Sequence, residues 1–302
     1  MIQVYPRPEE LADAVADHVS ACAREAISTT GRFTLALSGG STPQAAYSRL
    51  GTRDSRLSPD EWQRFHIVWG DERCVPPDDP RSNYRMAKEA LLDRVPIPPQ
   101  NVHRIRGEDD PEHAAADYEN ELEGLLREQS PHPERSEGSS RLSAGDSEDP
   151  SLALRMRDGA LRMAEGALGM TKGALRMTRI DLVLLGLGED GHTASLFPGQ
   201  PAVHETTRWV VAVPGPSRSP LTAHLSPEVW RVTLTPVILN AARNICFVVS
   251  GGNKAARLQQ VIEGPFTPDL LPAQAIRPDQ GRVTWMIDAA AGARLRSAPV
   301  AT

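Results

Sequence analysis

An uninterrupted apolar segment followed by a glycine-rich turn is the feature that most constrains the fold of this chain. Residues 181–192 read Asp-Leu-Val-Leu-Leu-Gly-Leu-Gly-Glu-Asp-Gly-His. Apolar residues without alternation are typical of a strand buried on both faces, as in a parallel sheet covered by helices. Glycine allows a tight turn or the close approach of a ligand, and ligands of open α/β sheets bind beyond the carboxyl ends of strands. The segment therefore predicts a central strand that carries Asp190 and His192 to a site; the alternative is a plain turn with a surface histidine.

Other segments predict the same order of strand, turn and helix. We expect further strands at residues 33–37, 66–69, 209–213, 231–235, 245–249 and 283–287. We expect helices at residues 8–27, 43–50, 87–92 and 114–126, a short helix through Leu239 and Ala242, one after Lys254, and an alanine-rich helix at the end. The alternation indicates an α/β fold with a doubly wound, mostly parallel sheet.

The length of the chain fits a single interrupted domain. Its 302 residues, 40% of them hydrophobic, suffice for one large α/β domain or two smaller ones. Residues 130–150 are rich in Ser, Pro, Glu and Gly and cannot bury enough apolar surface to become ordered. The motif Ala-Leu-Arg-Met then recurs every seven residues, but its apolar positions do not form a coiled-coil stripe. We expect one domain over residues 1–302, interrupted by a low-complexity insertion at about 129–179.

Charge and cysteine content limit which partners and which cellular compartment we expect. The net charge of −6 argues against nucleic acid as the main partner, because surfaces that bind nucleic acid are basic. Cys22, Cys74 and Cys246 are too few and too scattered for a disulfide framework or a zinc motif. No apolar run reaches the roughly 18 residues of a membrane helix, and the N-terminus lacks an apolar signal core. We expect a cytoplasmic monomer or small homo-oligomer that acts on a small molecule, with neither nucleic acid nor membrane as partner.

Two strand ends carry turns that are typical of anion sites. The strand at 33–37 runs into Ser38-Gly-Gly-Ser-Thr-Pro43 and then into a helix, whose free N–H groups and dipole favour phosphate. The turn matches neither a P-loop nor a dinucleotide fingerprint, and a simple helix cap is the alternative. Residues 250–254 repeat the arrangement and add Lys254, which could also be a solvated surface lysine.

Residues suited to acid–base chemistry follow other strands. Asp71-Glu72-Arg73 comes after the strand at 66–69; its arginine could hold an oxyanion by a forked pair of hydrogen bonds, or the three residues could form a structural salt-bridge cluster. Arg231 is a second candidate for an oxyanion. His192 is placed like a catalytic base next to a carboxylate. Because neither a Gly-x-Ser-x-Gly elbow nor a second histidine at metal-ligand spacing is present, a base acting on water or on a substrate C–H fits best.

Several motifs occur in one order along the chain and together resemble a known family. They read Leu35-Ala-Leu-Ser-Gly-Gly-Ser-Thr-Pro43, Trp69-Gly-Asp-Glu-Arg73 with Ser82-Asn-Tyr84, Gly186-Leu-Gly-Glu-Asp-Gly-His-Thr-Ala-Ser-Leu-Phe-Pro198, Arg231-Val-Thr-Leu-Thr-Pro236, Gly251-Gly-Asn-Lys254 and Trp285-Met-Ile-Asp288. This set resembles the 6-phosphogluconolactonase family over nearly the whole chain, apart from the insertion. The resemblance implies the doubly wound α/β fold shared with sugar-phosphate isomerases and glucosamine-6-phosphate deaminases. It also implies hydrolysis of 6-phospho-D-glucono-1,5-lactone to 6-phospho-D-gluconate in the pentose phosphate pathway, without cofactor or metal.

The resemblance further implies roles for individual residues. His192 would be the general base that activates water, Asp190 would orient or polarise it, and Arg73 would bind the substrate or its developing negative charge. The implied substrate- and phosphate-binding set is Gly39, Gly40, Ser41, Thr42, Arg231 and Lys254. The chain departs from the family at Ser226-Pro-Glu-Val-Trp230, where the family often has prolines, and this bears on the pose of Arg231.

Two other functions remain as alternatives. A sugar-phosphate deaminase or isomerase on the same fold would use the acid at Asp71 to remove a C–H proton and would release ammonia from glucosamine 6-phosphate. Arg73 directly after the acids, and the segment from Thr193 to Pro198, favour the lactonase. A non-catalytic sugar-phosphate sensor would bind without turnover, but the helix before Phe33 is too short for a helix-turn-helix pair.

Overall fold

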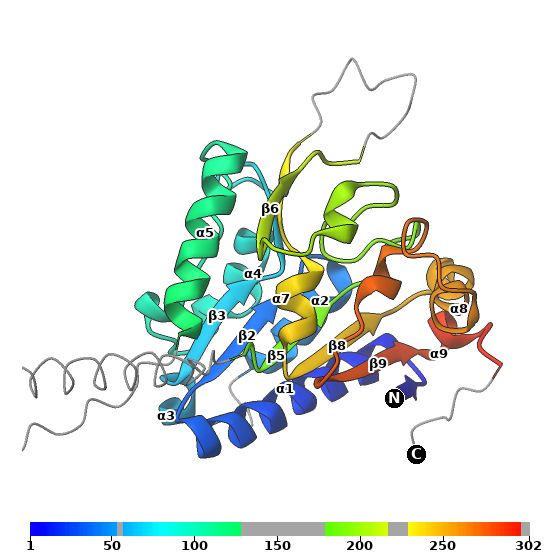
Figure 1. Cartoon of the computed structure of the whole chain (residues 1–302). Helices are drawn as coiled ribbons and strands as arrows, with labels where there is room; N and C mark the ends of the chain where they lie inside the picture. Colours follow the sequence, from blue (N-terminus) through cyan, green and yellow to red (C-terminus); the bar gives the residue numbers. More distant parts are fainter. Residues whose placement is uncertain (53–56, 128–178, 217–228, 297–302) are drawn as a thin grey trace, which may run out of the picture. The chain divides into compact units, whose positions relative to one another are not determined.

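The computed structural model describes residues 1–52, 57–127, 179–216 and 229–296 (Figure 1). Contacts divide the chain into two units, one formed by Met1–Gly124 with Arg179–Thr302 and the other by Leu125–Thr178. The predicted low-complexity insertion at 129–179 lies, apart from its last residue, outside the described residues. The described fold belongs almost entirely to the first unit.

A six-stranded parallel sheet forms the centre of the first unit (Figure 1). The order of its strands is β1-β9-β8-β5-β2-β3, and each neighbouring pair is parallel. Their bounds are β1 (Ile2–Tyr5), β2 (Phe33–Leu37), β3 (Phe65–Trp69), β5 (Leu182–Leu185), β8 (Asn244–Val249) and β9 (Arg282–Asp288). Every residue of β2 and β5 is buried, which confirms the prediction of a central strand enclosed on both faces.

Helices connect the strands, so the predicted α/β fold with a mostly parallel sheet is confirmed. They are α1 (Pro8–Thr30), α2 (Ser41–Leu50), α3 (Pro59–Trp62), α4 (Asn83–Ala90), α5 (Pro111–Leu126), α7 (Pro236–Ala241), α8 (Ala255–Glu263) and α9 (Ala289–Gly292). The helix predicted at 87–92 begins earlier, where Ser82 caps it by accepting a hydrogen bond from Arg85 N. Among the helices of the described segments, none is both long and apolar enough to cross a bilayer.

A second, antiparallel sheet differs from the sequence prediction. It joins β4 (Asp71–Arg73), β7 (Arg231–Leu234) and β6 (Val210–Val213) in the order β4-β7-β6. The strands near 209–213 and 231–235 are confirmed, but the prediction gave neither their separate sheet nor a strand at Asp71–Arg73. Three consecutive charged residues have little intrinsic preference for a strand, and only pairing with a segment far along the chain makes them one. The prediction also missed β1, which is four residues long.

The topology of the parallel sheet determines where a ligand can bind. Strand β2 pairs with β3 on one side and with β5 on the other, so the winding of the chain reverses between β2 and β5. Such a switch point opens a crevice beyond the carboxyl ends of the two strands. The segments that begin at Ser38 and at Gly186 follow these two ends.

Candidate active site

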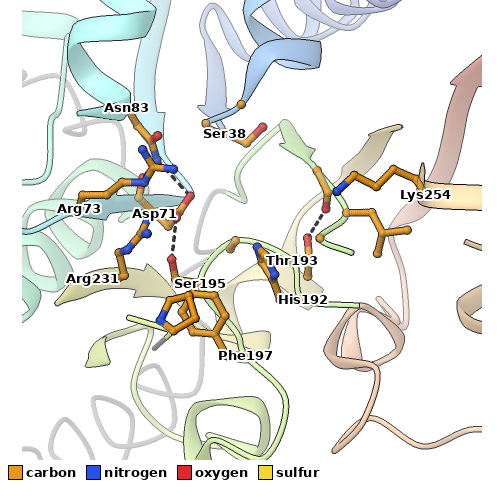
Figure 2. Close-up of a pocket in the computed structure, with 17 residues that line it drawn as sticks. Ser38, Asp71, Arg73, Asn83, His192, Thr193, Ser195, Phe197, Arg231 and Lys254 are labelled. Atoms are coloured by element: carbon orange, nitrogen blue, oxygen red, sulfur yellow. Dashed lines mark hydrogen bonds between the residues drawn. The ribbon is translucent and has the colours of Figure 1, made fainter. Parts of the chain in front are cut away.

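A cavity of about 300 Å³ lies beyond the switch point, between the ends of the parallel strands and the antiparallel sheet (Figure 2). Its volume suits a small polar ligand. From the predicted set, its lining contains Gly39, Gly40, Arg73, His192, Arg231 and Lys254. A smaller cavity of about 160 Å³ shares part of this lining and adds Ser41 and Thr42. The structure therefore brings the predicted residues together, with Asp190 placed behind His192.

His192 is oriented by the carboxylate of Asp190. The Nδ1 atom of His192 lies 2.5 Å from Asp190 Oδ1, and the backbone N–H of His192 donates to the same oxygen at 3.0 Å. Burial opposes the ionisation of Asp190, but the hydrogen bonds and charge of His192 outweigh burial and lower the pKa of Asp190 to about 2. Because a carboxylate only accepts hydrogen bonds, it fixes the proton on Nδ1 and leaves the lone pair on Nε2 available.

Glycines in the turn between β5 and His192 are required by this geometry. A Cβ atom at Gly188 would lie 2.1 Å from His192 Nδ1, so the imidazole packs directly on the backbone. Gly188 N also donates to His192 O at 2.8 Å. Gly191, between the acid and the base, has a φ of 93°, in the left-handed region that favours glycine. The imidazole also lies close to the ring of Phe197, with 4.9 Å between centroids.

Arg73 and Arg231 form a cross-strand pair at one side of the cavity (Figure 2). They are directly opposite each other in β4 and β7. The neighbouring pair is hydrogen bonded, since Cys74 N donates to Trp230 O at 2.8 Å. The arginines therefore occupy a non-hydrogen-bonded position, where facing side chains approach most closely. Residues 226–228, where the chain departs from the family pattern, lie outside the described residues.

The two guanidinium groups have unused hydrogen-bonding capacity. The Nε atoms of Arg73 and Arg231 are buried and have no partner within the described part of the chain, while Arg73 Nη1 donates to the carbonyl of Arg81. Burial, followed by the charge of Arg73, lowers the pKa of Arg231, against the opposing charge of Asp71. Two cations held together in this way form a site for negative charge.

The two acids before Arg73 have separate structural partners. The carboxylate of Glu72 accepts hydrogen bonds from the backbone N–H groups of Arg73, Asn83 and Tyr84, each at 2.7 Å, and from Ser82 Oγ at 2.9 Å. Glu72 thus caps the N-terminus of α4, and its pKa is raised by burial in spite of these bonds. Among the described residues, the partners of the Glu72 carboxylate are thus backbone amides and a serine hydroxyl, which does not favour the alternative of a structural salt-bridge cluster.

Asp71 is held by two residues that are absent from the predicted site set. Ser195 Oγ donates to Asp71 Oδ2 at 2.7 Å, and Asn83 Nδ2 donates to the carbonyl of Asp71 at 2.9 Å. Ser38, whose hydroxyl is buried without a partner among the described residues, also lines the cavity. All three stand inside the motifs quoted above, but the pairing of Ser195 with Asp71 joins positions 124 residues apart. Spacing along the chain could not reveal it.

Lys254 lies across the cavity from the arginine pair, with His192 between them (Figure 2). It lines the smaller cavity together with Ser41 and Thr42, at the start of α2. The first turn of α2 has no side-chain cap, so backbone N–H groups are available to an anion. Lys254 Nζ is 3.9 Å from Glu189 Oε1. The structure therefore groups Lys254 with the α2 turn, and Arg231 with Arg73.

At this site the protein offers cationic side chains and backbone amides. Among the described residues, no cluster of three or more His, Cys, Asp or Glu side chains could hold a metal ion. The arrangement provides one oriented imidazole between two positions for negative charge. It can activate a water molecule, or another weak acid, next to a bound anion.

Comparisons with known proteins place the chain in a family. The family described as glucosamine-6-phosphate isomerases/6-phosphogluconolactonase matches residues 6–137 and 139–285. The chain is 34% identical over 296 residues to 6-phosphogluconolactonase from Nostoc sp., covering 97% of this chain and 98% of that protein. It is 32% identical over 295 residues to probable 6-phosphogluconolactonase 3, chloroplastic, from Oryza sativa subsp. indica, covering 97% and 76%. The structure of 6-phosphogluconolactonase from Trypanosoma cruzi matches with a TM-score of 0.71 at 30% identity, covering 98% of this chain and 97% of that one. These matches confirm the resemblance: the chain belongs to the family of glucosamine-6-phosphate isomerases and 6-phosphogluconolactonases.

Proposed function

We propose that the chain hydrolyses 6-phospho-D-glucono-1,5-lactone to 6-phospho-D-gluconate, a step of the pentose phosphate pathway, with His192 as the general base. The single observation that carries the mechanism is the 2.5 Å contact between His192 Nδ1 and Asp190 Oδ1, which leaves Nε2 as a proton acceptor at the cavity. The reaction itself is inferred from the relatives, which are named 6-phosphogluconolactonase. The cations at two sides of His192 suit a substrate with a phosphate at one end and a carbonyl at the other.

His192 would act twice in the reaction. Nε2 accepts a proton from water while the water oxygen bonds to the lactone carbonyl carbon, whose π electrons move to the carbonyl oxygen. The resulting tetrahedral oxyanion collapses, the carbonyl re-forms, and the bond to the ring oxygen breaks. The imidazolium then returns its proton to the departing ring oxygen. The carboxylate of Asp190 stabilises the imidazolium between the two steps.

Arg73 and Arg231 would stabilise the oxyanion. Their guanidinium groups are fixed in a partly desolvated place before the reaction, and donors fixed in advance favour the charged transition state over the neutral ground state. The resemblance puts Arg231 in the substrate- and phosphate-binding set; its position opposite Arg73 favours the carbonyl end of the substrate.

The phosphate would bind at the opposite end of the cavity. The turn formed by Gly39, Gly40, Ser41 and Thr42 precedes α2, and its backbone N–H groups and helix dipole attract a dianion. Lys254 adds a positive charge at the same place. This arrangement explains how an acidic chain can bind an anionic substrate.

Turnover of freshly prepared 6-phosphoglucono-δ-lactone, coupled to 6-phosphogluconate dehydrogenase, tests the proposed function. Spontaneous ring opening is measured without enzyme and subtracted. We expect a rate far above this background, and no ammonia release from glucosamine 6-phosphate. Ammonia release without lactone hydrolysis would support the deaminase alternative, and sugar-phosphate binding without either reaction would support a sensor.

A further inference from the structure

A buried serine joins the loop that carries His192 to the strands that carry the two arginines. Ser195 Oγ donates to Asp71 Oδ2 at 2.7 Å, and Ser195 N donates to Thr233 Oγ1 at 3.1 Å. Ser195 is 1% exposed. Figure 2 shows the contact with Asp71. Because Asp71 and Thr233 are cross-strand partners in β4 and β7, one residue bonds to both strands at once.

The strands place these contacts next to the arginine pair. Side chains two residues apart on a strand point to the same face. Asp71 and Arg73 therefore share a face of β4, and Thr233 and Arg231 share the corresponding face of β7. The pair bound by Ser195 and the pair of arginines are consecutive on one side of the two strands. The bonds of Ser195 therefore connect the loop of His192 to the part of β4 and β7 next to the guanidinium groups.

The backbone between His192 and Ser195 is strained. Ala194 has a φ of 48°, and it is the only residue other than glycine with a positive φ in the described segments. Residues with a Cβ avoid this region and keep it only where their surroundings enforce it. On one side of Ala194, Thr193 Oγ1 donates to the carbonyl of Gly186 at 2.9 Å. The bonds of Ser195 fix the other side.

We infer that Ser195 is a positioning residue for the proposed hydrolysis. Its hydroxyl and its amide are committed to Asp71 and Thr233, so it acts through them: it sets the separation between the base and the arginines that receive the oxyanion. The inference rests on the proposed function, and it assigns a role that the family's motif alone does not give.

The variant Ser195→Ala removes the bond to Asp71. A small misplacement of catalytic groups can lower a rate by up to about a hundredfold, so we expect kcat to fall by about tenfold to a hundredfold. KM should stay within about threefold of the wild-type value, because the proposed phosphate-binding residues lie at the α2 end of the cavity, away from Ser195. The matched control is Ser20→Ala: Ser20 is also 1% exposed, and its hydroxyl bonds to Ala16 O within α1. Its kcat should equal that of the wild type.

A double-mutant cycle shows whether Ser195 acts through Asp71. If it does, Ser195→Ala should lower kcat much less in an Asp71→Ala background, which has no side-chain acceptor for Ser195 Oγ, than in the wild type. A fully multiplicative loss would overturn the inference, as would a folded Ser195→Ala variant with wild-type kcat, or an equal loss in Ser20→Ala.

A second variant covers the case in which Ser195→Ala does not fold. Thr233→Val keeps the shape of the side chain and removes the acceptor of the Ser195 amide, together with the bond from Thr233 Oγ1 to Leu234 O. We expect kcat to fall with KM nearly unchanged. Wild-type kcat in folded Thr233→Val would then contradict the inference. Failure of the proposed function is distinguishable, because the wild-type chain itself would not hydrolyse the lactone.

Discussion

Arg73 and Arg231 face each other directly across β4 and β7, and each keeps a buried Nε without a partner among the described residues. Like charges at facing positions destabilise a sheet. Burial and the charge of Arg73 lower the pKa of Arg231, while the charge of Asp71 opposes this. In the proposed function an anion between the two arginines would offset their repulsion. The antiparallel sheet thus supplies two of the three lysine and arginine side chains that line the cavity, the third being Lys254.

Replacing one arginine should separate stability from activity. Arg231→Met removes the like-charge contact and the buried, unpaired Nε while keeping most of the side-chain volume. We expect Tm to stay the same or rise by about 2–4 °C, the shift that corresponds to roughly 1 kcal/mol. We expect kcat/KM to fall at least about tenfold, since hydrogen bonds to charged groups contribute about 1.5–3 kcal/mol. A clear drop in Tm would show that the arginine pair stabilises the free protein.

Asp190→Asn tests how the base is oriented. The pKa of Asp190 is lowered to about 2, so its carboxylate is charged at every pH at which the enzyme would be assayed. An amide in its place can turn its NH₂ group toward Nδ1 and favour the wrong tautomer. We expect kcat to fall by about tenfold to a thousandfold, part of the usual contribution of general-base catalysis. Asp269→Asn is the control, because Asp269 pairs with His204 away from the cavity; similar losses in both variants would remove the orienting role.

Lys254→Ala tests the phosphate end of the cavity. Because Lys254 lies beside the α2 turn, its loss should raise KM for the phosphorylated lactone more than for unphosphorylated glucono-δ-lactone. High salt should diminish the difference. Lys88→Ala serves as the control, since Lys88 binds Asp93 on the surface. Equal effects of Lys254→Ala on the two lactones would contradict a phosphate contact.

A histidine pair distant from the site should make stability depend on pH. His66 Nδ1 lies 3.1 Å from His103 Nε2, and His103 Nδ1 lies 2.7 Å from Glu121 Oε1. Burial, then the charges of His103 and Arg32, lower the pKa of His66 to about 4. Unfolding raises it toward 6.5, so the unfolded chain binds the proton more readily.

The neutral form of His66 is thus favoured in the folded state, and its contribution to stability is complete above pH 6.5. It is lost as the pH falls from 6.5 toward 4. Thermal melts should show Tm decreasing over this window, and His66→Gln should make the decrease smaller. The control His113→Gln changes an exposed histidine and should follow the wild type; an unchanged slope in His66→Gln would contradict the assignment.

Most of the parallel sheet could be predicted because its information is local, although the four-residue β1 was missed. Unbroken apolar runs such as Leu182–Leu185, which Gly186 follows directly, give the strands and the edge of the sheet where the site lies. The antiparallel sheet could not be predicted, because Asp71–Arg73 has no strand-like composition and pairs with residues about 160 positions later. Pairing at that distance is decided by packing in three dimensions.

The candidate site shows the same division. Motifs indicated His192, Asp190 and the anion turns, because base, acid and glycine stand close together in the sequence. They did not indicate Ser195 or Asn83 as partners of Asp71, nor that Arg231 lies opposite Arg73. These contacts depend on which strands pair in the folded protein, and no local residue pattern predicts that pairing.

The most direct test of the account is the turnover of 6-phosphoglucono-δ-lactone by wild type, His192→Ala and His204→Ala, each corrected for spontaneous hydrolysis. His204 is a matched control because it also pairs with an aspartate, Nε2 to Asp269 Oδ1 at 2.6 Å, and does not line the cavity. We predict that His192→Ala lowers kcat by about 10² to 10⁴, the usual scale for a general base, while His204→Ala keeps wild-type kcat. Near-wild-type turnover by a folded His192→Ala variant would contradict the central claim.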